Sequence, residues 1–201
     1  MKTDWKRSAS HWYFFLAATA ISSFVLSWGV SIHCKPSPQE RIRYMVFTYG
    51  VEAQKLVEFT SSKIPDIREV KIEYSNPVQE KDTQRLFTYV YETVDFYIVP
   101  TSWMSMASGY SCHFDENSIH QAVPSSSNFE LYSFEGSFSG IKIYDHQTKQ
   151  GAAKSYFTYA SKDAPEEDFY LCFPASSCHT GSLGHQSLSE GLLIAEELLK
   201  L

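Results

Sequence analysis

The sequence predicts an α/β protein in which a membrane-spanning helix precedes one three-layer domain, a mostly parallel sheet with helices on both faces. Two observations lead to this class. Residues 12–32 form a run of 21 uncharged, mostly apolar residues, which is long enough as a helix to cross a bilayer core of about 30 Å. After it, short apolar runs at 42–49, 70–74 and 96–99 alternate with helical patterns, an order typical of parallel strands joined by crossover helices.

The apolar run is interpreted as an uncleaved signal anchor over residues 12–34, rather than a cleaved signal peptide. It is longer than the apolar core of a signal peptide, and His33 stands where a small residue should precede cleavage. The same missing small residue argues against a lipid on Cys34. Basic residues flank both ends, so we infer the orientation from the short basic tail, residues 1–11, which is expected in the cytoplasm. The sequence thus predicts a single-pass protein of the cell membrane with residues 35–40 as a stalk.

The remaining residues, 41–201, are expected outside the cytoplasm as a single domain, because they are too few for two full-sized ones. The formal net charge is −6, and no basic cluster is present that could neutralise phosphates, which argues against a nucleic-acid partner. The sequence contains neither a phosphate-binding Walker loop nor a dinucleotide glycine motif. No cofactor is therefore predicted.

The first half of this domain follows a regular order of strands and helices. A buried strand is expected at 42–49, and a helix at 51–59 because its apolar residues recur on one face. Alternation predicts a second strand at 70–74, helical spacing predicts a helix within 78–94, and residues 96–99 read as the most apolar strand. The pattern indicates strand, helix, strand, helix, strand.

The second half is less regular. Residues 111–165 are expected to be a reduced insertion rich in loops, with strands at 129–133 and 140–144. A buried strand is then predicted at 168–173. The Ser-x-x-Glu sequence at 187–190 has the form of a capping box and opens a helix with a broad apolar stripe.

Three cysteines of the domain, Cys112, Cys172 and Cys178, have no metal-ligand spacing, so no metal site is predicted from them. In an oxidising compartment a disulfide among the three is allowed, and the sequence does not determine which two would pair. The alternative is that they are small buried thiols.

Two further groups of residues are candidates for metal binding or catalysis. His113, Asp115, Glu116 and His120 are spaced like loose metal ligands, but their polar surroundings favour solvated side chains. No metal is predicted there.

Ser177, Cys178 and His179 place two nucleophile types beside a histidine, with Asp168 upstream. A catalytic triad is recognised by geometry, however, and the chain has neither a nucleophile elbow nor a cysteine-protease motif. The sequence therefore predicts a protein that is not an enzyme.

A family resemblance emerges from the order of several segments. Residues 47–50 lead into a helix, 64–67 precede the second strand, 95–104 carry the third strand and a Ser-Trp-Met turn, and 168–177 end in a serine-rich turn before the last helix. This order resembles the opening lobe of the extracellular solute-binding proteins that serve ABC importers, especially the sugar-type group with the type 2 periplasmic-binding fold. Full members carry a second lobe where this chain has only 111–165, so the resemblance implies a minimal or truncated relative.

Open parallel sheets bind ligands at the carboxyl ends of their strands, where helix N-termini offer free backbone donors. Aromatic side chains there could stack on a sugar and hydroxyls could bind its hydroxyl groups. The candidate ligand-binding residues are Thr48, Tyr49, Gly50, Thr101, Ser102, Trp103, Ser176 and Ser177. The alternative is that the Thr and Ser residues cap helices and the aromatic residues belong to the core.

Two functions follow. The first is a membrane-anchored, non-catalytic solute-binding module that presents a small polar ligand, a sugar or a peptide, to a transporter or sensor. The second is a membrane-tethered protein-interaction domain that keeps the scaffold without the pocket. The first predicts that Tyr49, Trp103 and Ser177 line one open crevice, whereas the second predicts that residues 111–139 fill it.

Overall fold

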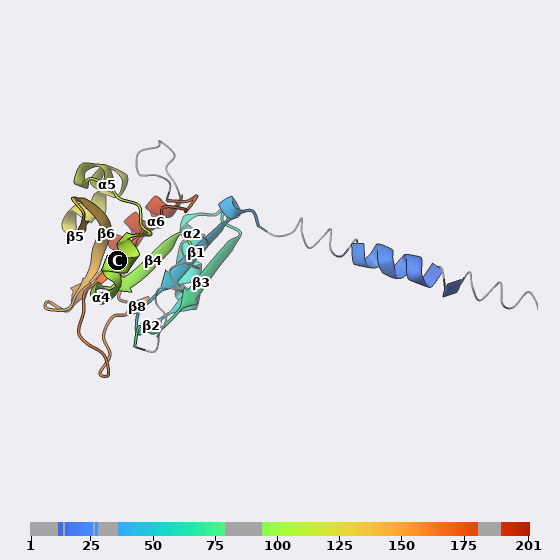
Figure 1. Ribbon diagram of the computed structural model, residues 1–201, viewed down its shortest axis with the longest axis horizontal. Coiled ribbons are helices and arrows are strands. Elements are labelled where there is room, and N and C mark those ends of the chain that lie inside the picture. The colour runs from blue at the N-terminus through green and yellow to red at the C-terminus, as the bar shows by residue number, and fades with distance from the viewer. Residues whose placement is uncertain (1–11, 14, 26, 28–35, 79–93, 181–189) are drawn as a thin grey trace, which may run out of the picture. The chain divides into compact units, whose positions relative to one another are not determined.

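The computed structural model of the chain describes residues 12, 13, 15–25, 27, 36–78, 94–180 and 190–201 (Figure 1). It divides into two units, residues 1–37 and residues 38–201, which are described separately. The candidate sites all lie in the second unit.

The prediction of a membrane anchor over residues 12–34 is wrong for the part of the unit that is described. Residues 12, 13, 15–25 and 27 are helical. Among the described residues, no helix has both the length and the apolar character needed to cross a bilayer, which takes about 20 apolar residues. Residues 14, 26 and 28–34 lie outside the described residues. The single-pass localisation rested on this anchor and is corrected with it.

The second unit is a mixed α/β domain with a largely sheet core. Its main sheet has the order β3-β1-β4-β9-β6-β5, with β7 paired to β6, and a small second sheet joins β2 and β8. The strands of the main sheet are β1 (Arg41–Val46), β3 (Glu69–Tyr74), β4 (Phe96–Pro100), β5 (Leu131–Phe134), β6 (Ser137–Asp145), β7 (Gln150–Gly151) and β9 (Phe169–Cys172). The small sheet consists of β2 (Gly50–Val51) and β8 (Phe157–Thr158).

Alternation along the central strands produces two apolar cores, one on each face of the sheet. In β4, Phe96 and Ile98 belong to the larger core, while Tyr97 and Val99 belong to the smaller one. Such alternation is what a strand gives when both of its faces are buried. The apolar runs of the sequence are therefore explained by burial on both faces.

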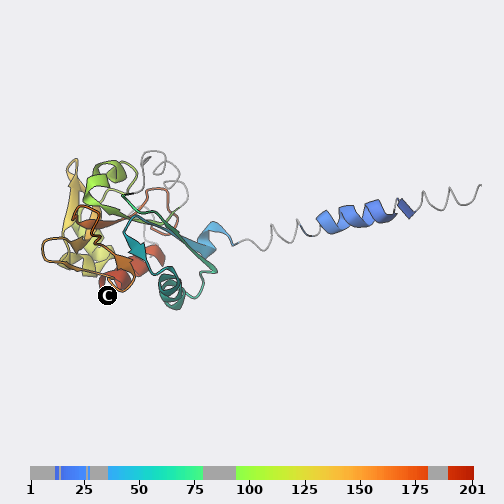
Figure 2. The ribbon, with the colours of Figure 1, turned by 90° about the horizontal axis from the view of Figure 1, so that it is seen from below.

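Helices cover both faces of the sheet. The larger core includes apolar side chains of α2 (Ala53–Lys63), α5 (Glu116–Ala122) and α6 (Glu190–Leu199). The smaller core is covered by α4 (Thr101–Ser108). Figure 2 shows α2 and α6 on one side of the sheet and α4 on the other. Two short 3-10 helices, η1 (Pro38–Glu40) and η2 (Pro124–Asn128), precede β1 and β5.

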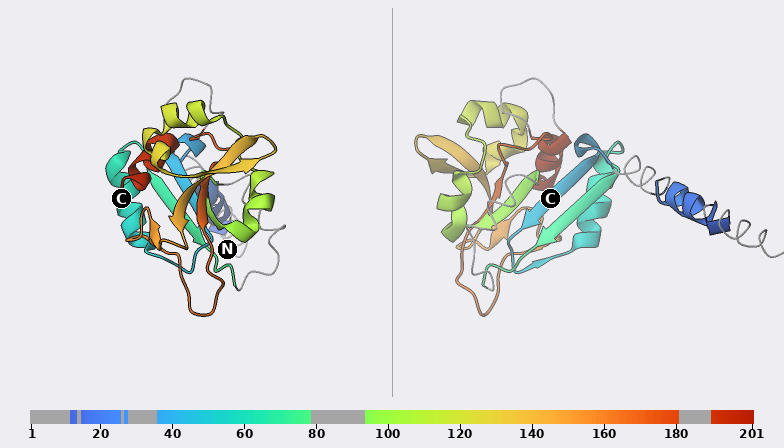
Figure 3. Two further views of the ribbon diagram at one scale, coloured as in Figure 1. Left: turned by 90° about the vertical axis from the view of Figure 1, so that its left-hand side faces the viewer. Right: turned by 45° about the vertical axis from the view of Figure 1, so that its right-hand side comes forward.

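The expectation of a mostly parallel sheet is wrong. Strands β3, β1 and β4 are parallel (Figure 3), but β9 is antiparallel to β4 and to β6, and β6 is antiparallel to β5 and β7. The reason lies in the preceding chain. Strand β8 pairs with β2, which follows β1, so the chain is already at the carboxyl edge of β1 and β4 when β9 begins. From that edge β9 can only run back.

Several expected elements are confirmed. Strands expected at 42–49, 70–74, 96–99 and 140–144 correspond to β1, β3, β4 and β6. The insertion, by contrast, holds the helix α5 and the 3-10 helix η2, which the sequence analysis missed because α5 is only seven residues long with Ile119 as its one buried residue. The helix expected within 78–94 and the capping box at 187–190 fall almost wholly outside the described residues.

Candidate functional site

The expected ligand edge at the end of β1 is closed by the chain itself. Thr48 is buried and its hydroxyl donates to the carbonyl oxygen of Gly50 over 2.9 Å, a contact within the turn. Tyr49 lies edge-on against Phe169, with 5.8 Å between the ring centroids, and its hydroxyl donates to the carbonyl oxygen of Pro165. These three residues therefore shape the turn and pack against the core.

The N-terminus of α4 is likewise occupied by residues of the chain. The backbone N–H of Ser102 donates to Oε2 of Glu167 over 2.8 Å, and the N–H of Thr101 donates to the carbonyl oxygen of Asp168. A carboxylate at this position satisfies a free helix donor and complements the helix dipole. Trp103 packs on Phe47, with ring centroids 4.9 Å apart. Glu167 thus takes the place expected for a ligand.

Ser176 and Ser177 lie at the opposite edge of the sheet from these turns. Both follow β9, which runs antiparallel to β4, so its carboxyl end meets the start of β4. The hydroxyl of Ser177 donates to Oδ1 of Asp95, which precedes β4, over 2.6 Å. The structure consequently separates the predicted site into two groups, because the sequence analysis assumed a parallel β9.

Asp95 is a buried carboxylate at the centre of this second group. Burial raises the pKa of Asp95, although hydrogen bonds from Ser177 and from the backbone of Arg43, together with the charge of His179, oppose the rise. The same Ser177 hydroxyl accepts the N–H groups of His179 and Thr180 over 3.1 and 3.2 Å. Asp95 and Ser177 together fix the turn after β9.

His179 is buried beside them and connects η1 to α6. Its Nδ1 lies 3.1 Å from Oε2 of Glu190, and its Nε2 lies 2.9 Å from the carbonyl oxygen of Pro38. Burial alone would lower the pKa of His179, but these two acceptors and the charge of Asp95 outweigh it and raise the pKa. The sequence suggested Asp168 as the carboxylate partner of His179. In the structure, the carboxylates near His179 are Asp95 and Glu190.

The three cysteines are free thiols, so no disulfide joins them. Cys112 and Cys172 are buried, and burial raises the pKa of both thiols, that of Cys112 to about 11. They therefore match the alternative of small buried thiols. Cys178 is exposed, beside the turn of Ser177.

The histidines of the insertion have nearby hydrogen-bonding partners within the insertion. Asp115 caps α5 by accepting the N–H of Ser118 over 2.9 Å. His113 lies 3.0 Å from the Ser137 hydroxyl, and His120 lies 2.7 Å from the Ser126 hydroxyl. These contacts explain the polar spacing as local structure.

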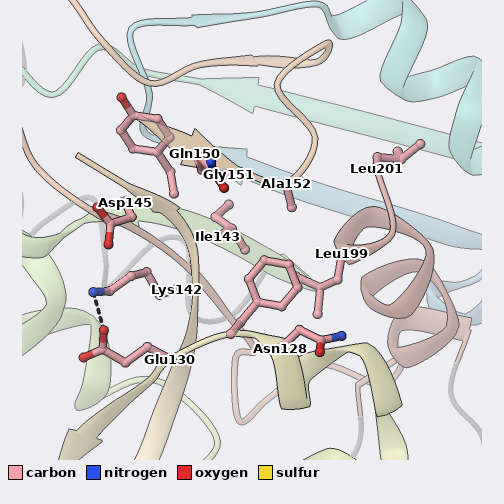
Figure 4. Close-up of a pocket in the computed structure, with 12 residues that line it drawn as sticks. Asn128, Glu130, Lys142, Ile143, Asp145, Gln150, Gly151, Ala152, Leu199 and Leu201 are labelled. Carbon is pink, nitrogen blue, oxygen red and sulfur yellow. Dashed lines mark hydrogen bonds and ion pairs between the residues drawn. The ribbon is translucent and has the colours of Figure 1, made fainter. Parts of the chain in front are cut away.

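A cavity of about 380 Å³ lies where β6, β7, the end of α6 and the segment before β5 meet (Figure 4). Its lining combines apolar and polar side chains. The charged pair Lys142–Glu130 stands on one side, and Leu199 with Leu201 on the other (Figure 4). The lining residues are Asn128, Phe129, Glu130, Lys142, Ile143, Tyr144, Asp145, Gln150, Gly151, Ala152, Leu199 and Leu201.

The charges around the cavity are largely satisfied within the chain. The Lys142 ammonium pairs with Glu130 and, at 3.0 Å, with Asp168. Burial alone would lower the pKa of Lys142, but these two carboxylates outweigh it and raise the pKa. Asp145 accepts the N–H groups of Gln147 and Thr148 in the turn before β7. A ligand in the cavity would therefore meet no uncompensated cation.

Two side-chain amides in the lining remain available. Across the described ranges, the side-chain amides of Asn128 and Gln150 make no hydrogen bond with the chain. An amide offers both donors and acceptors. The sequence does not indicate this cavity, because its lining comes from four separate segments that share no motif.

No protein-family model matches the chain, and no curated protein matches it in sequence. The resemblance to solute-binding proteins therefore stays a prediction.

Proposed function

We propose that the chain is a non-catalytic binding module for a small neutral polar solute of the sugar class, held in the cavity beside β6. The observation that carries the proposal is the cavity itself. Its volume of about 380 Å³ falls within the range of about 300 to 1,000 Å³ that is usual for small-ligand sites.

The lining suits a sugar. The partly exposed ring of Phe129 offers apolar surface to the carbon face of a sugar ring. The amides of Asn128 and Gln150 can donate to and accept from hydroxyl groups. Because Lys142 is already paired with two carboxylates, the cavity does not favour an anion.

The experiment is a thermal-unfolding screen of the full chain against monosaccharides, disaccharides, amino acids and dipeptides. A solute that binds only the native state stabilises it by about 2.7 kcal/mol at a hundred times Kd, which raises the Tm by about 5 to 10 °C for a domain of this size. We expect a sugar to produce this shift.

Matched variants locate the binding. The double variant Asn128→Ala/Gln150→Ala removes the two cavity amides and should abolish the shift. The control is Asn117→Ala/Gln147→Ala, which removes the same two residue types at exposed positions outside the cavity. Equal shifts in both variants would place binding elsewhere and contradict the proposed site.

A second candidate function, a protein-interaction domain, is favoured by one observation. Glu167 and Pro165 contact α4 and Tyr49 at the edge where the sequence predicted an open crevice. The closing segment is thus residues 165–168, and not 111–139 as expected. A screen in which no solute shifts the Tm of well-folded protein would contradict the binding module and leave this alternative.

A further inference from the structure

Three metal-ligand types converge at the edge of the sheet opposite α4. One ligand atom each from Asp95, Cys178 and His179 lies within 4.8 Å of the other two. We propose that these three side chains form a binding site for a transition metal ion, with Zn²⁺ as the ion that fits best. The site is separate from the solute cavity and does not depend on it.

The fold brings these residues together from distant parts of the sequence. Asp95 precedes β4, and Cys178 and His179 follow β9, which is antiparallel to β4. Asp95 and His179 are 7% and 1% exposed, whereas Cys178 is exposed. The two buried ligands are therefore held by the core, and the thiol completes the site from the solvent side.

The imidazole is already oriented as metal-bound histidines usually are. Its Nδ1 faces the Glu190 carboxylate at 3.1 Å, and a carboxylate on one ring nitrogen typically fixes the other as the metal ligand. That other nitrogen, Nε2, and the Cys178 sulfur both contact the carbonyl oxygen of Pro38, at 2.9 and 3.7 Å. The two ligand atoms therefore converge on the oxygen of Pro38, and a metal ion would bind by displacing this oxygen.

The carboxylate is also held in place. Ser177 donates to one oxygen of Asp95, and the backbone N–H of Arg43 donates to the other. A carboxylate has about four lone-pair sites, so two hydrogen bonds leave capacity for a metal. Such supporting contacts are what orient ligands in metal centres.

The chemical types of the three ligands indicate which metal ion the site would prefer. Thiolate, imidazole and carboxylate together suit Zn²⁺, and three protein ligands leave the fourth tetrahedral position for water. Beside the site lies a cavity of about 250 Å³ lined by Asp95, Ser177 and Cys178, among others. Binding replaces the proton of the Cys178 thiol and the proton on Nε2 of His179 with the metal, and both protons go to solvent.

The test uses Co²⁺ as a spectroscopic probe on the full chain after treatment with a chelator. We expect one Co²⁺ per chain, with visible bands of tetrahedral cobalt, a near-ultraviolet sulfur-to-cobalt band, and loss of both on addition of Zn²⁺. Cys178→Ser should abolish the sulfur-to-cobalt band, and this variant should fold because the side chain is exposed. Glu190→Gln, which alters a positioning residue, should weaken the affinity by about 10- to 100-fold.

The control is Cys34→Ser, which removes the cysteine that lies outside the described residues. It should keep the sulfur-to-cobalt band. The proposal is overturned by absence of that band at excess Co²⁺, or by a band that survives in Cys178→Ser.

Discussion

Asp168 illustrates how one side chain connects the cavity wall to the start of β9. Its Oδ1 accepts the N–H of His146 over 2.8 Å and lies 2.6 Å from Nδ1 of the same residue, while Oδ2 lies 3.0 Å from the Lys142 ammonium. Burial alone would raise the pKa of Asp168, but the hydrogen bonds from His146 and Lys142 outweigh it and lower the pKa. The ionised carboxylate is therefore part of the folded structure.

The pH dependence of stability follows from this lowered pKa. Because the pKa of Asp168 is lower in the folded than in the unfolded chain, the carboxylate stabilises the fold above about pH 4. This contribution is lost as the pH falls through the folded pKa. Urea unfolding measured stepwise from about pH 7 to about pH 2 should show the loss. In Asp168→Asn, we expect the unfolding free energy to fall less steeply as the pH is lowered over this range.

The same substitution should lower stability at neutral pH. Asp168→Asn weakens charge-assisted hydrogen bonds, which costs about 1 to 3 kcal/mol of unfolding free energy. The matched control is Asp163→Asn, at an exposed position nearby, which should change stability by less than about 0.5 kcal/mol. Equal effects of the two substitutions would show that the contacts of Asp168 contribute nothing specific.

At the scale of elements, the N-terminus of α4 depends on a carboxylate from another segment. Glu167 accepts the N–H of Ser102 over 2.8 Å. Removing its charge with Glu167→Gln should lower the unfolding free energy by about 0.5 to 1 kcal/mol, and less at high salt. Denaturant titrations at low and high ionic strength measure this difference.

The neighbouring Glu166 provides the control for Glu167. It pairs with Lys149, and both side chains are at least half exposed. Exposed pairs contribute little to stability, so Glu166→Gln should have the smaller effect. If Glu166→Gln cost more than Glu167→Gln, the carboxylate at α4 would not have the role described.

The hairpin of β6 and β7 requires a glycine at one position of the cavity wall. A Cβ at Gly151 would lie 2.6 Å from the carbonyl oxygen of Ile143 and 2.9 Å from Cα of Tyr144, and both of these atoms belong to the backbone. Gly151→Ala should therefore cost about 1 to 3 kcal/mol through overpacking.

The comparison for this glycine is Gly136→Ala in the turn before β6. Here a Cβ would meet no atom within 4 Å, but φ is +84°, so we expect a loss of about 1 kcal/mol from backbone strain alone. Guanidinium titrations measure the unfolding free energy of the two variants, and we expect the larger loss for Gly151→Ala. A smaller loss for Gly151→Ala would contradict the close approach of the two strands.

The elements differ in how far the sequence could predict them. The strand at 96–99 was predictable because four consecutive apolar residues are buried from both faces of the sheet. The direction of β9 was not, since hydrophobic periodicity is the same for parallel and antiparallel strands. Direction depended on the pairing of β8 with β2, which two-residue strands do not reveal in a sequence.

The direction of β9 determines which of the predicted site residues lie together. Tyr49 and Trp103 were correctly placed after β1 and β4, at one edge. Ser177 was placed with them by assuming a parallel β9, and it lies at the other edge beside Asp95. The cluster of Asp95, Cys178 and His179 arises from the same antiparallel pairing, so the sequence pattern could not indicate it.

At the scale of the molecule, residues 38–201 form one α/β domain in which Glu167 closes the expected ligand edge and a cavity lies beside β6. The cavity lining comes from η2, β6, β7 and the end of α6. No short motif connects these segments, and only the folded chain brings them together. We propose that a solute binds beside β6, in the cavity that these segments form.

The most direct measurement is a methyl NMR titration of isoleucine-labelled protein with the solute panel. Ile143 lines the cavity, whereas Ile67 is buried near the end of α2 and does not line it. We predict a saturable shift of the Ile143 methyl signal with a sugar, with the Ile67 signal unchanged and the response lost in Asn128→Ala/Gln150→Ala. An Ile143 signal that stays in place while every solute of the panel is raised to saturating concentration would contradict the account.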